Sequence, residues 1–385
     1  MLAEIVFNKH VLKEQGGFTY QIPVALQNQI EVGQLVTAPL KNKLEKGIVI
    51  KIQNSKFKIQ KFELKEIEKI ITPSPLLKKW QIEVARWMSA YYCAHLFQCL
   101  HLFLPTPLWQ QKYSLDQELL VELLDKNWQP HPRSGWQKRL KKNLESGIWN
   151  IDKKEFKLGD LKKLEEKGII QLKYGKIKNS LPTTNYQLPT TNSFHRFTPD
   201  QQKIFNLVAK SPTKKPFLLH GVTGSGKTEI YLQLAHCYFQ QGKQALVLVP
   251  EIALTPQLIQ YFTQTFKNQI AVIHSQLTEH ERVVAWFRIQ KKEAMLVIGS
   301  RSALFSPLQN PGLIVIDEEH EWTYKNEQAP RYHTRAVAER IANLTGSTLL
   351  LGSATPSVES YHKTQTGEYA LLELPKKIEI KGNLS

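Results

Sequence analysis

The stretch LLHGVTGSGKTEIYLQ, from Leu218 to Gln233, decides the fold of the carboxyl-terminal half of the chain. Its centre fills the pattern G-x-x-x-x-G-K-[ST], in which glycines let backbone N–H groups turn inward around phosphate oxygens. Lys227 is then placed to reach the β and γ phosphates of a nucleotide, and Thr228 to ligate Mg²⁺. The sequence therefore predicts a nucleotide-binding loop made of Gly221, Val222, Thr223, Gly224, Ser225, Gly226, Lys227 and Thr228.

Apolar runs alternate with amphipathic stretches from Phe197 onward. The runs are FLLHG, ALVLVP, IAVIHS, AMLVIGS, LIVIDEE and TLLLGSA, and each ends in small or polar residues. Short runs that are apolar throughout are typical of parallel strands buried on both faces, with functional residues at their carboxyl ends. We predict one α/β domain of about 190 residues, within the usual size of a domain.

LIVIDEEH places Asp317 and Glu318 directly after one of these strands. Asp317 is expected to hold Mg²⁺ and Glu318 to polarise an attacking water, because phosphoryl transfer needs positioning and charge neutralisation. The alternative for this acidic run is plain surface charge.

The composition points to a polyanionic partner. The chain of 385 residues has a formal net charge of +17 and 42% hydrophobic residues, with a pI near 9.5. Such a field favours nucleic acid, although excess lysine also serves simply as solubilising surface.

Export and membrane insertion are not indicated. The amino terminus, MLAEIVFNKH, lacks the features of a signal peptide, and we find no apolar run of the roughly 18 residues that a membrane span needs. A cytoplasmic location is expected by elimination. Cys93, Cys99 and Cys237 form no CxxC pair, so neither a disulfide framework nor zinc is predicted, and Cys93 and Cys99 are expected on a buried helix face.

Two regions precede a linker, and a third follows it. Residues 1–108 contain short β-like runs, expected as a small barrel or sheet, and end in a helical stretch over residues 76–104. Residues 109–180 mix helices with lysine, and LGDLKKLEEKG followed by IIQLKYG is typical of a winged helix, or equally of a generic small helical domain. Residues 181–193 have linker composition, and residues 194–385 form the α/β domain.

The wording of the motifs resembles one family. D-E-x-H with Gly352, Ser353, Ala354 and Thr355 (G-S-A-T) resembles motifs II and III of superfamily 2 helicases. GVTGSGKTEIY, LVLVPEIALTPQ, VIGSRSALFSP, VIDEEHEWTYKNEQAPRYHTR and LGSATPS are similar to the family of primosomal replication-restart helicases, PriA. GGFTYQIP, GQLVTAPL and GIVIKI resemble its amino-terminal DNA-binding domain. The resemblance implies a multidomain chain: a small β-rich DNA-binding domain, a winged-helix-like α+β domain, and an α/β RecA-like P-loop domain with a parallel sheet.

The resemblance implies ATP and Mg²⁺ as cofactors, with Lys227, Asp317 and Glu318 as catalytic residues and Mg²⁺ held by Thr228 and Asp317. It places Gln201, in FTPDQQ, near the adenine. The alternative for Gln201 is a glutamine that starts a helix.

The resemblance also implies DNA contacts. Thr255, Ser300 and Arg301 would donate to phosphates of single-stranded DNA, or else cap helices. Trp322, Tyr324 and Tyr332, with Arg331 and His333 among them, would form an aromatic-rich loop on which bases stack. A pocket for a 3′ end would lie near Phe18, Thr19, Gly33 and Lys65, where Thr19 replaces the usual aspartate of the family.

The function implied is an ATP-dependent 3′ to 5′ DNA helicase that recognises stalled or D-loop forks and initiates primosome assembly. Its expected partners are forked and single-stranded DNA, the primosome proteins PriB and DnaT, and single-stranded-DNA-binding protein, at the nucleoid. The second motor lobe of the family, its Zn²⁺-binding cysteines and its arginine finger have no counterpart in this sequence. We therefore expect weak nucleotide binding and little hydrolysis by this chain alone, since such an arginine contributes roughly 10³ to 10⁵ in rate. The alternative is a fork-DNA-binding fragment or scaffold without motor activity.

Overall fold

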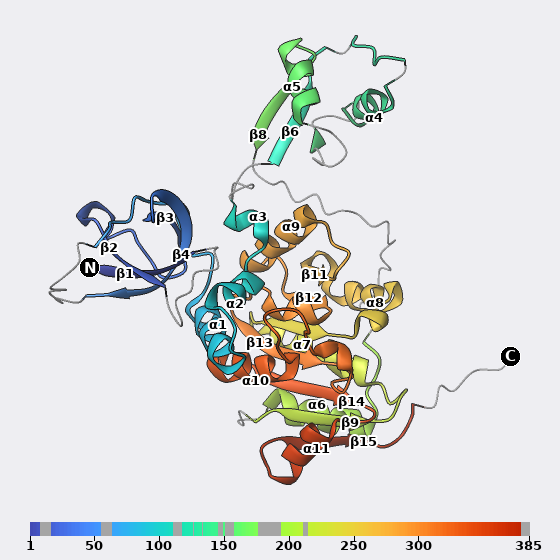
Figure 1. Ribbon diagram of the computed structural model, residues 1–385. Helices are drawn as coiled ribbons and strands as arrows, with labels where there is room; N and C mark the ends of the chain where they lie inside the picture. Colours follow the sequence, from blue (N-terminus) through green and yellow to red (C-terminus); the bar gives the residue numbers. More distant parts are fainter. Residues whose placement is uncertain are drawn as a thin grey trace. The chain divides into compact units, whose positions relative to one another are not determined.

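The computed structural model describes residues 1–7, 17–54, 64–110, 118–125, 127–132, 134–144, 149–150, 158–175, 194–210 and 215–378 (Figure 1). The chain divides into two compact units. The first contains residues 1–110 and 187–385, and the second contains residues 111–186. The predicted linker over residues 181–193 lies outside the described residues.

The first unit begins with a small antiparallel barrel. Its strands run in the order β2-β1-β4-β3-β5. A bridge between Gln21 and Glu66 joins β2 to the segment before β5, with Gln21 N–H donating to Lys65 O at 3.0 Å. The alternating pattern of β1 and β2 directs apolar side chains inward, onto a core that includes Ile5 and Val49. Of the two predicted forms, the barrel is the one observed. The elements are β1 (Leu2–Phe7), β2 (Phe18–Gln21), η1 (Val24–Leu26), β3 (Leu35–Leu40), β4 (Lys43–Gln53) and β5 (Lys69–Ile70).

Three helices follow the barrel: α1 (Lys79–Tyr91), α2 (Leu96–Phe103) and α3 (Thr106–Trp109). Helices α1 and α2 occupy most of the helical stretch predicted for residues 76–104, but the chain turns between them, where Cys93 adopts a φ of 50°. Cys99 is buried in α2, as predicted, whereas Cys93 is exposed in the turn. No helix among the described residues combines the length and apolar character needed to cross a membrane.

The second unit is an α+β fold. β6 (Glu118–Leu123) pairs antiparallel with β7 (Trp149–Asn150) and β8 (Ile170–Gly175), in the order β7-β6-β8. The helices α4 (Gly135–Leu144) and α5 (Leu158–Glu166) contribute Leu140 and Leu161 to its core. Strands and helices together are consistent with the α+β prediction, and the winged-helix assignment stays a prediction.

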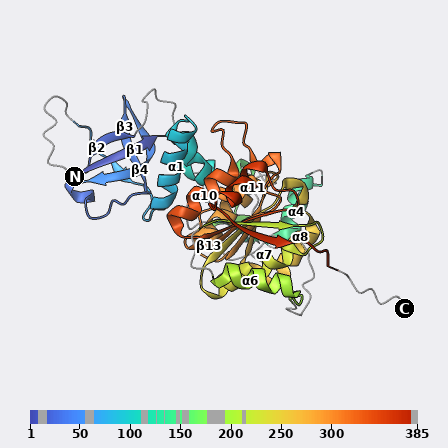
Figure 2. The same ribbon diagram turned by 90° about the horizontal axis from the view of Figure 1, so that it is seen from below.

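The rest of the first unit is the predicted α/β domain. Seven parallel strands run in the order β11-β12-β10-β13-β14-β9-β15. Strands β10, β12 and β13 are buried throughout, as their apolar sequences require. Figure 2 shows α6 and α7 on one side of the sheet and α10 and α11 on the other. The strands are β9 (Phe217–Gly221), β10 (Gln244–Leu248), β11 (Ile270–Ile273), β12 (Leu296–Gly299), β13 (Pro311–Ile316), β14 (Thr348–Ser353) and β15 (Ala370–Leu374). The helices are α6 (Pro199–Lys210), α7 (Lys227–Gln240), α8 (Pro256–Phe266), α9 (Glu279–Gln290), α10 (Thr334–Thr345) and α11 (Val358–Gln365), with short 3-10 helices η2 (Glu251–Ala253), η3 (Lys267–Gln269), η4 (Arg301–Phe305) and η5 (Trp322–Tyr324).

The helices after the barrel pack against the α/β domain. The indole N–H of Trp286, on α9, donates to the carbonyl oxygen of Phe103 at 2.9 Å, and Trp286 is only 4% exposed. The ring of Phe103 meets that of Phe305 edge-on, with centroids 5.0 Å apart. A buried aromatic side chain that also satisfies a buried carbonyl fixes both the spacing and the orientation of the two layers.

We expect Trp286→Ala to lower the free energy of unfolding by about 3–5 kcal/mol, because it removes a buried indole and leaves a carbonyl without its donor. Urea unfolding followed by circular dichroism measures the change. Trp322→Ala is the matched control, since Trp322 is 75% exposed. Equal losses in the two variants would contradict the packing described.

Candidate nucleotide and DNA sites

The predicted phosphate-binding loop joins β9 to α7. Gly224 and Gly226 have φ values of +81° and +79°, a left-handed conformation that glycine adopts without strain. At Gly226 there is also no room for a side chain, because a Cβ would lie 2.3 Å from Nε2 of Gln201. The loop thus ends at the N-terminus of α7, where the Gly226 cap supplies no side-chain acceptor for the first backbone N–H groups.

The loop offers donors for an anion. Lys227 is only 8% exposed; its Nζ donates to Gly221 O at 2.8 Å and lies 3.6 Å from Oε1 of Glu318. The Ser225 hydroxyl is buried and is one of the described side-chain groups without a hydrogen-bond partner. A buried ammonium, an unsatisfied hydroxyl and the open end of a helix together fit a phosphate group.

Asp317 and Glu318 follow β13 at the same edge of the sheet. Burial, with a smaller contribution from the adjacent Glu318 carboxylate, raises the pKa of Asp317 to about 6. The Tyr231 hydroxyl donates to Asp317 Oδ1 at 2.9 Å. Among the described residues no group of three or more His, Cys, Asp or Glu side chains has the arrangement of a metal site. Mg²⁺ is typically held by one or two carboxylates with phosphate oxygens and water, and Asp317 offers one such carboxylate.

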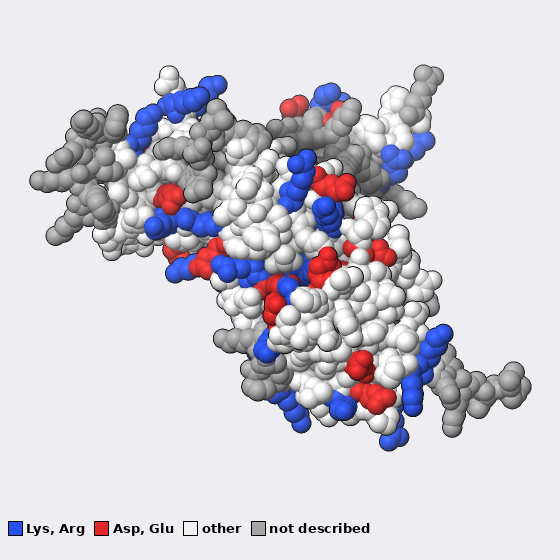
Figure 3. Space-filling model, turned by 60° about the horizontal axis from the view of Figure 1, so that its bottom comes forward, with Lys and Arg blue, Asp and Glu red and all other residues white. Residues whose placement is uncertain are grey.

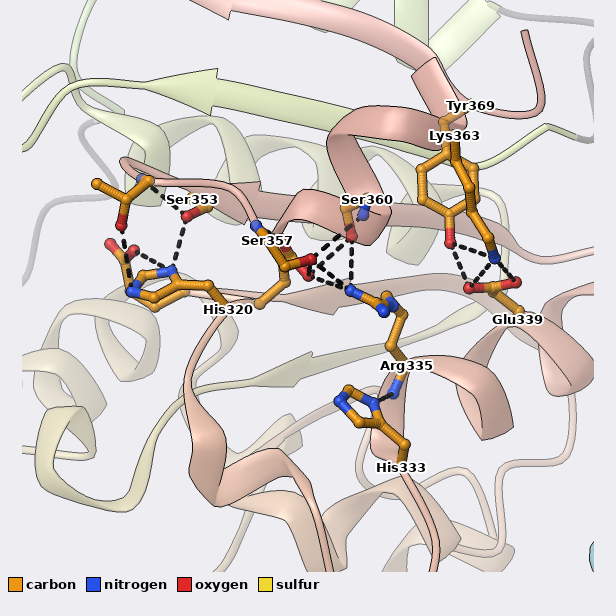
Figure 4. Close-up of polar contacts among 12 residues, drawn as sticks. His320, His333, Arg335, Glu339, Ser353, Ser357, Ser360, Lys363 and Tyr369 are labelled. Atoms are coloured by element: carbon orange, nitrogen blue, oxygen red, sulfur yellow. Dashed lines mark hydrogen bonds and ion pairs between the residues drawn. The ribbon is translucent and has the colours of Figure 1, made fainter. Parts of the chain in front are cut away.

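The segment Gly352–Thr355 contacts the acidic segment directly (Figure 4). Nδ1 of His320 lies 2.8 Å from the Ser353 hydroxyl, and its Nε2 lies 3.3 Å from that of Thr355. The backbone N–H of Ala354 donates to Glu318 Oε2 at 3.4 Å. The segment predicted as motif III therefore contacts Glu318 and His320 directly, so a movement of Glu318 would alter its hydrogen bonds.

Glu319 is the acceptor of a buried hydrogen-bond network that was not predicted from the sequence. Its side chain is fully buried, and Oε2 accepts from Arg335 Nη1 at 2.9 Å and from the Ser360 hydroxyl at 2.9 Å. Oε1 accepts the backbone N–H of Ser357 at 2.7 Å. As Figure 4 shows, Arg335 and the two serines converge on one carboxylate, which joins the segment after β13 to the starts of α10 and α11. Surface charge, the alternative considered for this run, is wrong for Glu319.

Gln201 is hydrogen-bonded to the backbone of the phosphate-binding loop. It is 2% exposed, and its Nε2 donates to Ser225 O at 3.0 Å and to Gly226 O at 3.4 Å. Its Oε1 accepts the N–H of Thr198. The Gln201 N–H in turn donates to the Thr198 hydroxyl, so Gln201 has the helix-start role considered from the sequence and also contacts the loop. A contact with adenine stays a prediction.

The three residues predicted to contact DNA phosphates have different surroundings. The Thr255 side chain accepts from Leu258 N–H and caps α8, the alternative considered from the sequence. Ser300 is 8% exposed at the start of η4. Arg301 donates to the carbonyl oxygens of Thr323 and Lys325 and so holds the loop after β13.

Of the three aromatic rings predicted to stack on bases in the loop after β13, only Trp322 is exposed to solvent. Trp322 is 75% exposed, but Tyr324 and Tyr332 are 2% and 4% exposed. The Tyr324 hydroxyl donates to Asp317 O at 2.7 Å, and Tyr332 packs edge-on against Phe305. Base stacking by the two tyrosines is therefore wrong for this arrangement. Of the cations predicted there, Arg331 donates to Glu327 O, and His333 caps α10 by accepting Arg335 N–H.

The pocket predicted in the barrel is only partly assembled. Thr19 is exposed on β2, where Phe18 packs against Phe7 with centroids 5.9 Å apart. Lys65 lies beside the end of β2, and its Nζ donates to Lys41 O at 2.7 Å.

Gly33, the fourth residue predicted for this pocket, lies just before β3. It is buried, its N–H donates to Val49 O, and a Cβ would lie 2.0 Å from Leu77 O, so a residue larger than glycine does not fit here. Its contact with a DNA end stays a prediction.

The net positive charge is not gathered into one patch on the face that Figure 3 shows. Lys and Arg side chains stand beside Asp and Glu side chains over the described part of that face.

Two parts of the chain match known protein families. Residues 198–364 match the family model "DEAD/DEAH box helicase", and residues 5–105 match "3′DNA-binding domain (3′BD)". The chain thus combines a DEAD/DEAH box helicase region with a region similar to a 3′ DNA-binding domain.

The curated relatives are replication restart proteins PriA. That of Chlamydia muridarum is 32% identical over 98% of this chain and 52% of its own length, and that of Bacillus subtilis is 44% identical over 57% of this chain and 27% of its own length. Together with the two domain matches, they support the assignment of this chain to the PriA family. The chain spans about half the length of the relatives that it matches throughout. Among solved structures, RecG bound to a three-way DNA junction covers 49% of this chain and 25% of its own at 19% identity, with a TM-score of 0.37, too low to add to the assignment.

The Asp317 carboxylate should cost stability when no cation is present. Because the folded pKa of Asp317 lies above its ordinary value of 3.8, the penalty grows as the pH rises from about 4 and is complete above about 6. Asp317→Asn keeps an oxygen acceptor for Tyr231 and removes the charge. We expect this variant to unfold at a higher temperature than the wild type at pH 8 in EDTA, and the gain to vanish near pH 4. Asp200→Asn, at an exposed position of α6, is the control, and a gain independent of pH would contradict this account.

Proposed function

We propose that this chain provides the DNA-end-binding module and the first ATP-binding lobe of an ATP-dependent 3′ to 5′ DNA helicase that acts in replication restart. The observation that carries the proposal is the convergence of Lys227, Asp317, Glu318 and the Gly352–Thr355 segment at one edge of the sheet, within the unit that also contains the barrel. The names of the relatives and of the two matching families agree with it.

The residues divide the work at the nucleotide as follows. Backbone N–H groups of residues 222–228 and the Lys227 ammonium would hold the phosphates, and Asp317 with Thr228 would hold Mg²⁺. When bound, Mg²⁺ supplies neutralisation of the charge on the transferring phosphate. Lys227 lies 3.6 Å from Glu318, so a phosphate that competes for Lys227 leaves the Glu318 carboxylate to accept a proton from water.

Hydrogen bonds between the acidic segment and residues 352–355 would couple ATP hydrolysis to DNA binding. Ala354 N–H reaches Glu318, and the His320 ring reaches both Ser353 and Thr355. Displacement of this segment by bound DNA would alter the surroundings of the general base. Trp322 is the exposed ring placed nearest in sequence to these residues and is our candidate for contact with a base.

The expected ligands of the whole protein are forked and single-stranded DNA. PriB, DnaT and single-stranded-DNA-binding protein remain partners that the family resemblance suggests, as does a location at the nucleoid. The 3′ to 5′ polarity rests on the same resemblance.

Lys227→Ala should weaken the binding of a fluorescent ATP analogue in Mg²⁺ by about tenfold to a hundredfold, because a charge-assisted hydrogen bond is worth about 1.5–3 kcal/mol. Binding to forked DNA, measured by fluorescence anisotropy, should stay unchanged. Lys291→Ala, an exposed lysine at the end of α9, is the matched control. Equal nucleotide affinity in the two variants would refute the assignment of the ATP site.

The barrel should distinguish the chemistry of a DNA end. We expect a fork whose leading strand ends in a 3′-hydroxyl to bind about tenfold more tightly than one that ends in a 3′-phosphate, the effect of about one hydrogen bond. Thr19→Ala should reduce this ratio, whereas Leu44→Ala, at an exposed position of β4, should not. Identical affinity for the two forks at several salt concentrations would refute end recognition. End recognition without Mg²⁺-dependent nucleotide binding would instead support a fork-binding protein that is not a motor.

A further inference from the structure

Tyr231 is buried at the ATP site although no motif includes it. It lies on α7, four residues beyond Lys227, and is 1% exposed. Its hydroxyl donates to Oδ1 of Asp317 at 2.9 Å, across 86 residues of sequence. A tyrosine hydroxyl is protonated at neutral pH, so it acts as the donor to this carboxylate.

Gly352 leaves the space that the Tyr231 hydroxyl occupies. A Cβ at position 352 would lie 1.7 Å from the Tyr231 hydroxyl oxygen and 3.3 Å from Oδ1 of Asp317. Gly352 does not need a positive φ, so the reason for glycine here is space for the hydroxyl. Three residues from α7, β14 and the end of β13 therefore meet at one carboxylate oxygen.

We propose that Tyr231 is a positioning residue that orients the Asp317 carboxylate for Mg²⁺, with Gly352 providing the space that its hydroxyl needs. The inference rests on the proposed ATP-binding function. Without this hydroxyl, one oxygen of Asp317 would lose its neutral donor and the carboxylate would face the like charge of Glu318. Groups that orient a metal-binding carboxylate through a hydrogen bond affect metal affinity by about tenfold to a hundredfold when they are removed.

A purely structural role is the competing explanation, because Tyr231 also belongs to the core between α7 and the sheet. Tyr238 provides the comparison that separates the two. It lies two turns further along α7, is 7% exposed, and its hydroxyl bonds to the Thr348 hydroxyl at 2.6 Å, away from the acidic residues. Removing either hydroxyl costs one buried hydrogen bond, but only Tyr231 contacts Asp317.

The experiment measures the binding of a fluorescent ATP analogue to the whole chain as Mg²⁺ is titrated. In Tyr231→Phe, the Mg²⁺ concentration for half-maximal binding should rise about tenfold, while binding of the analogue in EDTA stays unchanged. Tyr238→Phe should match the wild type in both. An unchanged Mg²⁺ requirement in Tyr231→Phe, with wild-type binding intact, would overturn the positioning role alone. If wild type and Lys227→Ala bind the analogue equally, the ATP site itself is refuted and the inference falls with it.

Stability measurements test the pairing with Gly352 independently of any ligand. Gly352→Ala should lower the unfolding temperature strongly in the wild-type background and less in Tyr231→Phe, because removing the hydroxyl oxygen relieves the 1.7 Å overlap and leaves a ring carbon at 2.9 Å. Strictly additive losses would overturn the pairing.

Discussion

The register of three neighbouring parallel strands is the constraint on which the candidate site depends. β14 lies between β13 and β9, with Ile316 paired to Leu351 and Leu351 paired to Leu218. In a parallel sheet the carboxyl ends of such strands meet at one edge. The phosphate-binding loop, the acidic pair and the Gly352–Thr355 segment each follow one of these strands. A slip of one residue in any pairing would turn its side chains to the other face of the sheet and separate the three.

The same register brings together charges that are costly to bury. The site removes three charged side chains from solvent: Lys227, Asp317 and Glu319. Each is stabilised by a specific protein partner. The Glu319 carboxylate is satisfied by Arg335 and two serines, so it behaves as a closed network that fixes the starts of α10 and α11. Asp317 accepts a hydrogen bond from the Tyr231 hydroxyl, but burial still raises its pKa to about 6.

Local chemistry explains which parts of this arrangement could be predicted from the sequence. Phosphate and Mg²⁺ require particular residue types close together in the sequence. The P-loop glycines, Lys227 and the acidic pair could therefore be recognised as motifs. The α/β architecture followed from apolar runs of strand length, and the barrel from short runs bounded by turns. Tyr231 and Arg335 could not be found in this way, because each acts on a residue distant in sequence. Gln201 was expected at the site, but its contact with the backbone of the loop was not. The break after α1 was missed because the apolar pattern continues across Cys93 while the backbone does not.

The aromatic loop shows why residue type alone does not decide function. Tyrosines among cations are typical both of a surface that stacks on bases and of an amphipathic seam between packed elements. Here the rings of Phe103, Phe305 and Tyr332 form successive edge-on contacts at 5.0 and 5.1 Å, and the Tyr92 hydroxyl accepts His333 N–H. The aromatic residues of the loop thus build the seam where α1 and α2, which follow the barrel, meet the α/β domain. Because Tyr324 also reaches the Asp317 carbonyl, that seam and the candidate ATP site share one loop, and a shift of the helices beside it changes the surroundings of both.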